Sequence, residues 1–359
     1  MNNLFSLLLI AGLFLMVGSS YRGNDLFQVI SSHPHDVEEL SPYVETVHQS
    51  GRLWIVQLKK NAPDSIMPHL RTLSGREKNY LYEGLYVTNK SRKANRVNIQ
   101  SFTRAVDIQS IQNDVEELAA YETRYVGTLE NKQALDKGAA RLQGMGYKIQ
   151  EICYREICSL IAERKGLINP ESVIMIMGHI DSVGEAFAGA DDNASGTAVL
   201  LEMARVLKDY QNQKTIRFFI SNGEEVGLVG STHYARRLLD AQELKKIKLV
   251  INMDMVGYNS NGLVEIETNP EFDELARWLA DLASKFTSLK TKITLGAWGS
   301  DHLPFLNRGV PALLTIEDWD TKNPCYHQEC DTADKINYEY AGEIAKLNIS
   351  AVIAKDLDQ

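Results

Sequence analysis

The sequence predicts an α/β protein with a mostly parallel central sheet and helices on both faces, preceded by a small N-terminal pro-segment. From about residue 106 onward, short apolar runs alternate with segments of helical periodicity, the pattern typical of a sheet covered by helices. The run at residues 173–177 is continuously apolar, as expected of a strand buried on both faces. At 359 residues, the chain is long enough for one large domain and a smaller one.

The expected elements of the larger domain follow in order. The run at 173–177 lies between Pro170 and Gly178, and a helix follows in which Val199, Met203 and Val206 recur at helical spacing. Further strands are predicted at 215–220, 247–252 and 310–316, with helices at 272–286 and 344–351.

The first hundred residues have a different organisation. Residues 1–20 hold a short apolar core that ends in small residues, which predicts a signal peptide, with an uncleaved membrane anchor as the alternative. Residues 21–105 include predicted strands at 53–58 and 84–88 and a basic stretch between Lys90 and Arg104. We expect a pro-segment there; a permanent accessory domain is the alternative, and N-terminal sequencing of the mature protein distinguishes the two.

Charge and cysteine content limit the function. The formal net charge is −9 and no basic stripe is present, so a nucleic-acid partner is not expected. Cys153 and Cys158 lie five residues apart, as do Cys325 and Cys330, and neither spacing is a CxxC motif. Four cysteines allow three pairings; two local loops are the simplest, and disulfides favour a secreted, periplasmic or extracellular location.

Polar residues follow several predicted strands. His179 and Asp181 come after the first, the pair Glu224–Glu225 after the second, and Asp254 after the third. Each feature alone has an ordinary explanation; paired glutamates, for example, are common on solvated faces. An unpaired charge at Asp254, between two methionines, would however be costly.

Two further segments add ligand-type side chains. Asp191 and Asp192 precede a predicted helix, where either could simply cap it, and His327 follows the last strand between two cysteines. Ligands of open α/β sheets bind beyond the carboxyl ends of the strands, so these residues are expected to meet. Imidazole and carboxylate suit zinc, and five ligands suit two ions that share a carboxylate.

Five segments, in this order, resemble the M28 family of co-catalytic zinc aminopeptidases. They are Gly-His-Ile-Asp-Ser at 178–182, Gly-Ala-Asp-Asp-Asn-Ala-Ser-Gly at 189–196, Asn-Gly-Glu-Glu at 222–225, Asn-Met-Asp at 252–254 and Tyr-His at 326–327. Ser-Asp-His-Leu-Pro-Phe at 300–305 also resembles a family segment. The resemblance covers roughly 106–355 and implies a zinc-peptidase domain of the phosphorylase/hydrolase-like fold over 106–359.

The resemblance implies a role for each residue. The expected ligands of two Zn²⁺ per chain are His179, Asp191, Glu225, Asp254 and His327, with Asp191 as the bridge between the ions. Glu224 corresponds to the general base, and Asp181 to the hydrogen-bond partner of His179. The family also implies a non-Pro cis peptide bond between Asp191 and Asp192.

The expected function is that of a secreted metallo-aminopeptidase, which hydrolyses the first peptide bond of peptides with a free N-terminus. The family's secreted bacterial members carry a tyrosine shortly before the Ser-Asp-His segment, whereas residues 295–300 here read Leu-Gly-Ala-Trp-Gly-Ser. Oxyanion stabilisation then depends on the metals or on a residue that the sequence does not identify.

Other functions are also compatible with these residues. A glutaminyl cyclase-like single-zinc acyltransferase and a carboxypeptidase or amidase share the expected fold, and so does a non-catalytic binding domain. We expect no stable membrane partner once the signal peptide is removed.

Overall fold

The computed structural model describes residues 26–30, 40–50, 53–59, 62–63, 71–72, 97–184 and 186–358. The predicted signal peptide, the predicted strand at 84–88 and residues 90–96 of the basic stretch lie outside the described residues. Within the described part, no helix combines the length and apolar character needed to cross a membrane.

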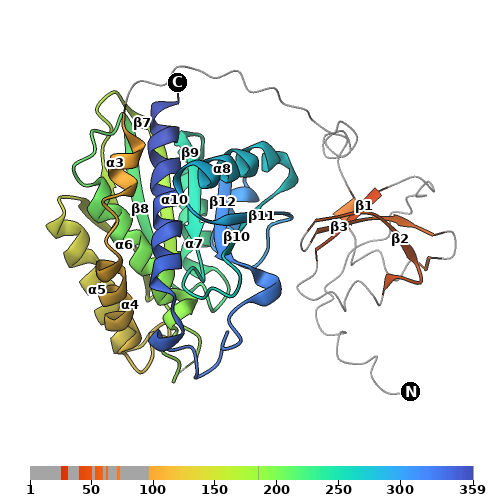
Figure 1. The fold of residues 1–359 in the computed structure, drawn as a ribbon, viewed down its shortest axis with the longest axis horizontal. Helices are drawn as coiled ribbons and strands as arrows, with labels where there is room; N and C mark the ends of the chain where they lie inside the picture. Colours follow the sequence, from red (N-terminus) through yellow and green to blue (C-terminus); the bar gives the residue numbers. More distant parts are fainter. Residues whose placement is uncertain are drawn as a thin grey trace.

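The larger unit is built on an eight-stranded sheet with the order β11-β10-β12-β9-β7-β8-β6-β5 (Figure 1). The pairings β10–β11, β12–β9, β9–β7 and β7–β8 are parallel, and the other three are antiparallel. The mostly parallel sheet that the sequence predicted is therefore confirmed. The strands are β5 (Lys148–Tyr154), β6 (Ile157–Arg164), β7 (Asn169–His179), β8 (Lys214–Ser221), β9 (Ile247–Met253), β10 (Leu263–Thr268), β11 (Lys290–Leu295) and β12 (Ala312–Glu317).

The central strand β7 shows why the sheet needs helices on both faces. Successive side chains of a strand point to opposite faces. Accordingly, Ile174 and Ile176 belong to one apolar cluster, whereas Met175 and Met177 belong to another. All four side chains are fully buried, so each face must be covered.

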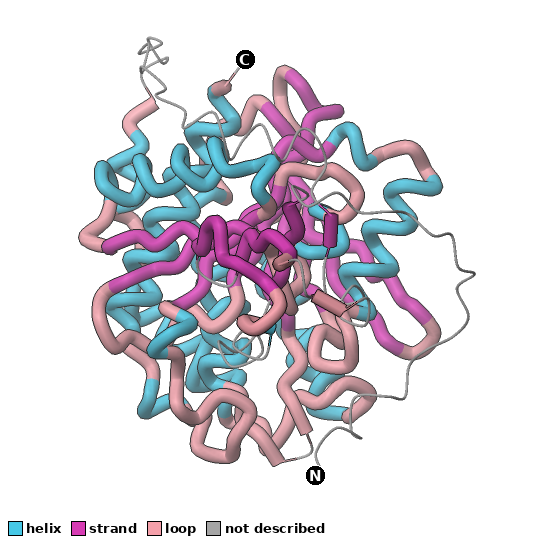
Figure 2. Tube along the Cα trace, turned by 90° about the vertical axis from the view of Figure 1, so that its right-hand side faces the viewer, coloured by secondary structure: helices cyan, strands magenta, loops and turns pink. Residues whose placement is uncertain are grey.

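Helices cover both faces of the sheet, as Figure 2 shows. The larger apolar cluster contains residues of α4 (Ile108–Ala119), α5 (Leu129–Gly144), α6 (Gly196–Leu207), α8 (Asp273–Phe286) and α10 (Tyr338–Leu357). The smaller cluster contains residues of α7 (Val229–Asp240) and α9 (Leu303–Leu306). Helices on both sides of the sheet thus complete a three-layer architecture.

The beginning of the larger unit lies before the expected boundary at residue 106. The short helix α3 (Ile99–Thr103) packs against α10, and Val97 and Phe102 contact the larger apolar cluster. Residues 97–105 therefore pack with the larger unit, although the sequence analysis assigned them to the preceding segment.

The N-terminal segment contains a separate four-stranded sheet with the order β2-β3-β1-β4. Its strands are β1 (Leu26–Ile30), β2 (Val44–Ser50), β3 (Leu53–Leu58) and β4 (Arg71–Thr72), and every pairing between them is antiparallel. Strand β3 coincides with the strand predicted at 53–58.

Candidate metal centre

The carboxyl ends of neighbouring parallel strands place the polar residues together. His179 is the last residue of β7, Glu224 and Glu225 follow β8, and Asp254 follows β9. Because β9, β7 and β8 are adjacent in the sheet, these side chains converge at one edge. His327 reaches the same place from the loop after β12.

Asp192 lies at the centre of this cluster. Its Oδ1 is 3.3 Å from Nε2 of His179, and its Oδ2 is 3.1 Å from Nε2 of His327. His179 Nε2 is also 3.2 Å from Asp254 Oδ1, and His327 Nε2 is 3.1 Å from Glu225 Oε2. The two oxygens of one carboxylate thus face two separate imidazole–carboxylate pairs.

The sequence analysis expected Asp191 in this position, and the structure places it elsewhere. The Asp191 carboxylate accepts hydrogen bonds from the backbone N–H groups of Gly257 and Tyr258, at 2.8 and 3.1 Å, and from Asn323 Nδ2 at 3.2 Å. It is fully buried and ties three loops together. The non-Pro cis peptide bond joins Asp192 to Asn193, likewise one residue later than expected.

The backbone around these aspartates is tightly enclosed. Gly189 has a positive φ of 56°, and a Cβ atom there would lie 2.4 Å from the carbonyl oxygen of Asp192. A Cβ atom on Gly196 would lie 2.4 Å from the carbonyl oxygen of Met253. Gly189 therefore lets the loop fold back on itself, and Gly196 lets the loop pack against the end of β9.

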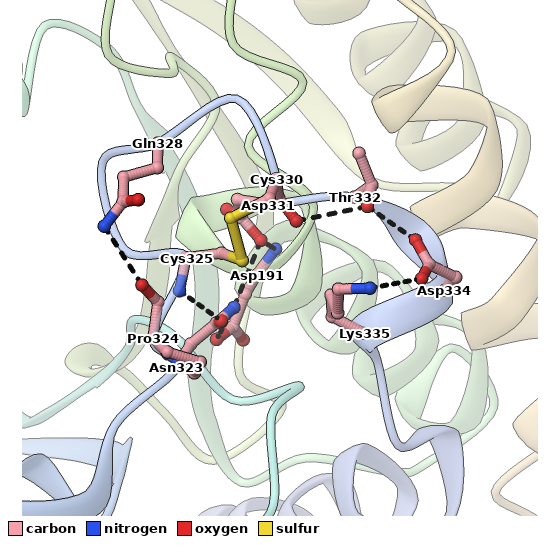
Figure 3. The surroundings of a disulfide bond; sticks show 10 residues. All are labelled: Asp191, Asn323, Pro324, Cys325, Gln328, Cys330, Asp331, Thr332, Asp334 and Lys335. Atoms are coloured by element: carbon pink, nitrogen blue, oxygen red, sulfur yellow. Dashed lines mark hydrogen bonds and ion pairs between the residues drawn. A yellow bond between two sulfur atoms is a disulfide. The ribbon is translucent and has the colours of Figure 1, made fainter.

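The disulfide loop that carries His327 also holds the aspartate loop. Figure 3 shows Asp331, beside the disulfide, in contact with Asp191. The carboxylate of Asp331 accepts the backbone N–H groups of both Asp191 and Asp192, at 2.9 and 3.0 Å. Asp331 directly follows Cys330, which is bonded to Cys325. One short cross-linked loop therefore presents a histidine to the cluster and fixes the backbone of Asp192.

Asp181 holds the backbone of the glutamate pair and contacts His179. Its two carboxylate oxygens accept the backbone N–H groups of Glu224 and Glu225, at 3.2 and 3.1 Å. Nδ1 of His179 is 3.1 Å from the backbone oxygen of Asp181 and 3.6 Å from its carboxylate. Asp181 thus contacts His179 as expected, but the hydrogen bond to the ring involves its backbone, and its carboxylate holds the glutamate pair.

Further contacts orient Asp254, and sequence patterns did not reveal them. Ser300 Oγ donates to Asp254 Oδ2 at 2.6 Å and accepts from Asn252 Nδ2 at 2.8 Å. The fully buried Arg124 donates to backbone carbonyls, including those of Ile180 and Gly189, and so fixes the loops on either side of the cluster. Nothing in the sequence near Arg124 distinguishes it from a surface arginine.

Charge accumulates at this end of the sheet. Burial and, next to it, the charge of the neighbouring Asp192 raise the pKa of Glu225 to about 7. Burial also raises the pKa of Glu224 well above its usual value, and Asp254 and Asp301 add to that rise. Although burial by itself lowers the pKa of His327, Asp192 and Glu225 raise it to about 10. The pKa values of Glu224, Glu225 and His327 thus depend on both burial and the charges of neighbouring residues.

A cavity of about 280 Å³ opens over the cluster. Glu224, Glu225, Asp192, Asp254 and His327 form its polar part. Its apolar wall is made by Leu228, Met255, Trp298, Leu314, Ile316, Trp319 and Tyr326. The cavity therefore combines an acidic floor with an aromatic and aliphatic side.

Comparison with known proteins identifies the family to which the chain belongs. The sequence pattern of Peptidase family M28 matches residues 159–352, more than half of the chain. The chain belongs to peptidase family M28. The matched span contains every polar residue of the cluster, from His179 to His327.

The relatives of this M28 chain include proteins named as aminopeptidases. It is 34% identical over 199 residues to the aminopeptidase YwaD of Bacillus subtilis, a match that covers 54% of the chain and 43% of that protein. The chain thus spans less than half the length of this curated relative. Its fold is shared with BSAP, a zinc aminopeptidase from Bacillus subtilis (TM-score 0.62, 20% identity, 69% and 95% of the two chains), and with a glutaminyl cyclase from Bacteroides thetaiotaomicron (TM-score 0.58, 21% identity, 69% and 97%).

The donor set of the M28 chain fits zinc. Two groups of three side chains bring their ligand atoms within 4.8 Å of one another, namely His179 with Asp192 and Glu225, and His179 with Glu224 and Asp254. The buried Glu225 Oε1 has no hydrogen-bond partner among the residues that the structure describes, which leaves a lone pair for a cation. Because Nδ1 of His179 faces a backbone oxygen, Nε2 is left as the nitrogen that can bind a metal.

Both disulfides join cysteines that are five residues apart. Cys153 pairs with Cys158 across the β5–β6 hairpin, and Cys325 pairs with Cys330. Of the three pairings that the sequence allowed, the two local loops are therefore the ones formed.

Proposed function

We propose that this M28 chain is a secreted zinc aminopeptidase that holds two zinc ions, with Asp192 as the shared ligand. The observation that carries the proposal is the position of Asp192, whose two oxygens face His179 and His327. Asp254 would complete the site of His179, and Glu225 that of His327. The two disulfides favour an oxidising compartment outside the cytosol.

Zinc bound at these residues would supply Lewis acidity and would lower the pKa of water to about 7. Glu224 lines the cavity, and Asp181 fixes its backbone. Because its pKa is raised by burial, Glu224 suits the task of taking a proton from water and delivering it to the departing amine.

Tyr326 supports the reaction from the apolar wall of the cavity. Its ring stacks on the ring of His327, with centroids 3.9 Å apart. Burial and the carboxylates of Asp192, Asp254 and Glu225 raise the pKa of its phenol, so the hydroxyl keeps its proton as a donor. We propose that Tyr326 donates a hydrogen bond to the oxyanion that forms at the scissile carbonyl, the role that the sequence left unassigned.

The walls of the cavity indicate the substrate. The acidic floor attracts a positively charged amino terminus, which would confine cleavage to the first peptide bond. Met255, Leu314, Ile316 and Trp319 offer an apolar surface to the first side chain. We therefore propose peptides with an apolar N-terminal residue as the preferred substrates.

The second proposed zinc site distinguishes this proposal from a single-zinc acyltransferase. Glu225 and His327 form a second imidazole–carboxylate pair beside that of His179 and Asp254, which favours the two-metal hydrolase. A panel of aminoacyl chromogenic substrates, run beside carboxyl-blocked and amino-blocked peptides, distinguishes an aminopeptidase from a carboxypeptidase or an amidase.

The decisive experiment compares Asp192→Asn with Asp191→Asn. Elemental analysis should find close to two zinc ions per chain in the active wild-type protein. Asp192→Asn should lose at least one ion together with aminopeptidase activity, whereas Asp191→Asn should retain both ions because its carboxylate binds backbone N–H groups. Loss of zinc from Asp191→Asn alone would return the bridging role to Asp191, and full activity with one zinc ion would exclude the two-metal proposal.

A further inference from the structure

A second cavity lies at the opposite end of the central sheet. Its volume is about 830 Å³, and it opens at the amino ends of β7, β8, β9 and β12, the four adjacent strands of the core. About ten residue steps of 3.3 Å separate Asn169, which lines it, from His179 in the acidic cluster, so the two sites are roughly 30 Å apart. We call it the amino-end cavity.

The amino-end cavity is lined by five cations and one carboxylate. The cations are Lys214, Lys245, Lys248, Arg308 and Lys355, and the carboxylate is that of Asp358. This excess of positive charge stands out in a chain of net charge −9.

Most of these cations have no carboxylate partner among the described residues. Lys214 Nζ donates to the backbone oxygens of Asp356 and Asp358, at 2.6 and 2.5 Å. Lys248 Nζ donates to the backbone oxygen of Lys245 at 2.8 Å, and Arg308 Nη1 donates to that of Pro304 at 2.7 Å. Backbone oxygens orient these side chains; the carboxylates of Asp356 and Asp358 act electrostatically on Lys214, but neither forms an ion pair with it among the described residues.

Only Lys355 is paired within the cavity, at 3.5 Å from Asp358 Oδ2. Elsewhere on the described surface, lysines are commonly paired: Lys132 lies 2.8 Å from Asp136, and Lys137 lies 2.6 Å from Glu117. Three lysines and Arg308, none of them in an ion pair among the described residues, thus line one cavity that can present them to a common ligand.

The remaining lining residues are hydrogen-bonding groups and apolar side chains. Asn169 and Ser172 supply polar groups at the start of β7. Leu239, Leu244, Ile247, Val310 and Pro311 form the apolar part. Leu239 is 52% exposed, and Leu167 and Ile168, which precede Asn169, are 68% and 73% exposed.

We propose that the amino-end cavity binds a phosphoryl-bearing anion. A phosphoryl group carries up to two negative charges and three acceptor oxygens, so it can use several lysines and an arginine at once, as a single carboxylate cannot. The apolar residues beside the cations suit a ligand whose phosphoryl group is joined to an apolar body. The group has two possible sources, a free phosphorylated compound or the headgroup of an anionic lipid.

The test measures binding to the full-length protein with two probes. Calorimetric titration with inorganic pyrophosphate probes a free phosphoryl compound. Co-sedimentation with phosphatidylglycerol vesicles, compared with phosphatidylcholine vesicles, probes the lipid headgroup. Saturable binding of pyrophosphate, or selective binding to phosphatidylglycerol, supports the proposal and identifies the source.

Variants locate the binding. Lys245→Ala combined with Lys248→Ala should weaken binding roughly tenfold or more, because two charge-assisted contacts are lost. The matched control, Lys285→Ala combined with Lys290→Ala, removes two exposed lysines that do not line the cavity and should bind as wild type. Lys245→Glu, a single exposed change, gives a second variant whose thermal unfolding is measured beside the others.

Absence of saturable binding to either probe overturns the proposal, and so does equal weakening in the cavity variants and the control. Because binding is the readout, failure of the aminopeptidase proposal would leave this test unaffected.

Discussion

The two ends of the central sheet are charged in opposite ways and are held with different precision. At the carboxyl end, buried carboxylates and histidines meet, and hydrogen bonds fix nearly every one of these side chains. Asp192, for example, contacts both histidines through its carboxylate and Asp331 through its backbone N–H. At the amino end, lysines that are partly or largely exposed reach backbone oxygens and solvent.

The difference has an energetic cause. Burying several like charges is costly unless cations or hydrogen bonds compensate, so the carboxyl end requires a dense hydrogen-bond network, and the proposed zinc ions would offset the remaining negative charge. Exposed lysines cost little free energy, because water solvates their charges and screens the repulsion between them. The carboxyl end is therefore suited to chemistry that demands fixed geometry, and the amino end to binding that tolerates adjustment.

The largest effect is expected from Glu224→Gln. This substitution keeps the size of the side chain but removes the proposed base, so kcat should fall by about 10²–10⁴-fold with KM little changed. Zinc content and folding should persist because Glu224 is not a proposed ligand. Steady-state kinetics and elemental analysis measure both effects.

Glu225→Gln is the matched control for that experiment. Its carboxylate lies 3.1 Å from His327 Nε2, so its loss should lower the occupancy of one zinc site, and added zinc should partly restore activity. If Glu224→Gln loses zinc while Glu225→Gln keeps both ions, the two roles are exchanged. Unchanged peptide hydrolysis in both variants would contradict the proposed enzyme.

Tyr326→Phe tests whether the apolar wall takes part in the reaction. Removal of one donor to an oxyanion typically costs about 10²–10³-fold in kcat, and we expect an effect near the lower end, since the metals would share the task. KM and zinc content should change little. Tyr154→Phe, on the exposed β5–β6 hairpin, provides the control. A rise in KM with unchanged kcat would show that Tyr326 only contacts the substrate.

The smallest expected effect comes from removing the disulfide beside His327. Cys325→Ser combined with Cys330→Ser should lower zinc affinity about 10–100-fold, because the loop fixes both His327 and the backbone of Asp192. The accompanying loss of stability should be no more than about 2 kcal/mol for so short a loop. Chelator competition measures zinc affinity, and thermal unfolding measures stability.

Cys153→Ser combined with Cys158→Ser is the control, since that disulfide also closes a five-residue separation but lies in a hairpin. Equal losses of zinc affinity in the two double variants would mean that the effect is not specific to the His327 loop.

Much of the fold could be predicted because local periodicity reports burial. Strands β7, β8, β9 and β12 and helices α6, α8 and α10 lie where apolar runs and helical spacing placed them. Strands β5, β6, β10 and β11 were not predicted. Strand β5 buries only Ile152 among its seven residues, which gives little periodic signal.

The sequence by itself determined which strand ends would carry the cluster, because residue type and position after an apolar run are local properties. His179, Asp181, Glu224, Glu225, Asp254 and His327 all meet at the expected edge of the sheet. Tertiary structure alone decided which of two adjacent aspartates faces the histidines. Asp191 and Asp192 have the same side chain, and the choice depends on distant partners: N–H groups after β9 hold the carboxylate of Asp191, and Asp331 holds the backbone of Asp192. Those partners lie about 66 and 139 residues further along the chain, a separation that no local pattern can encode.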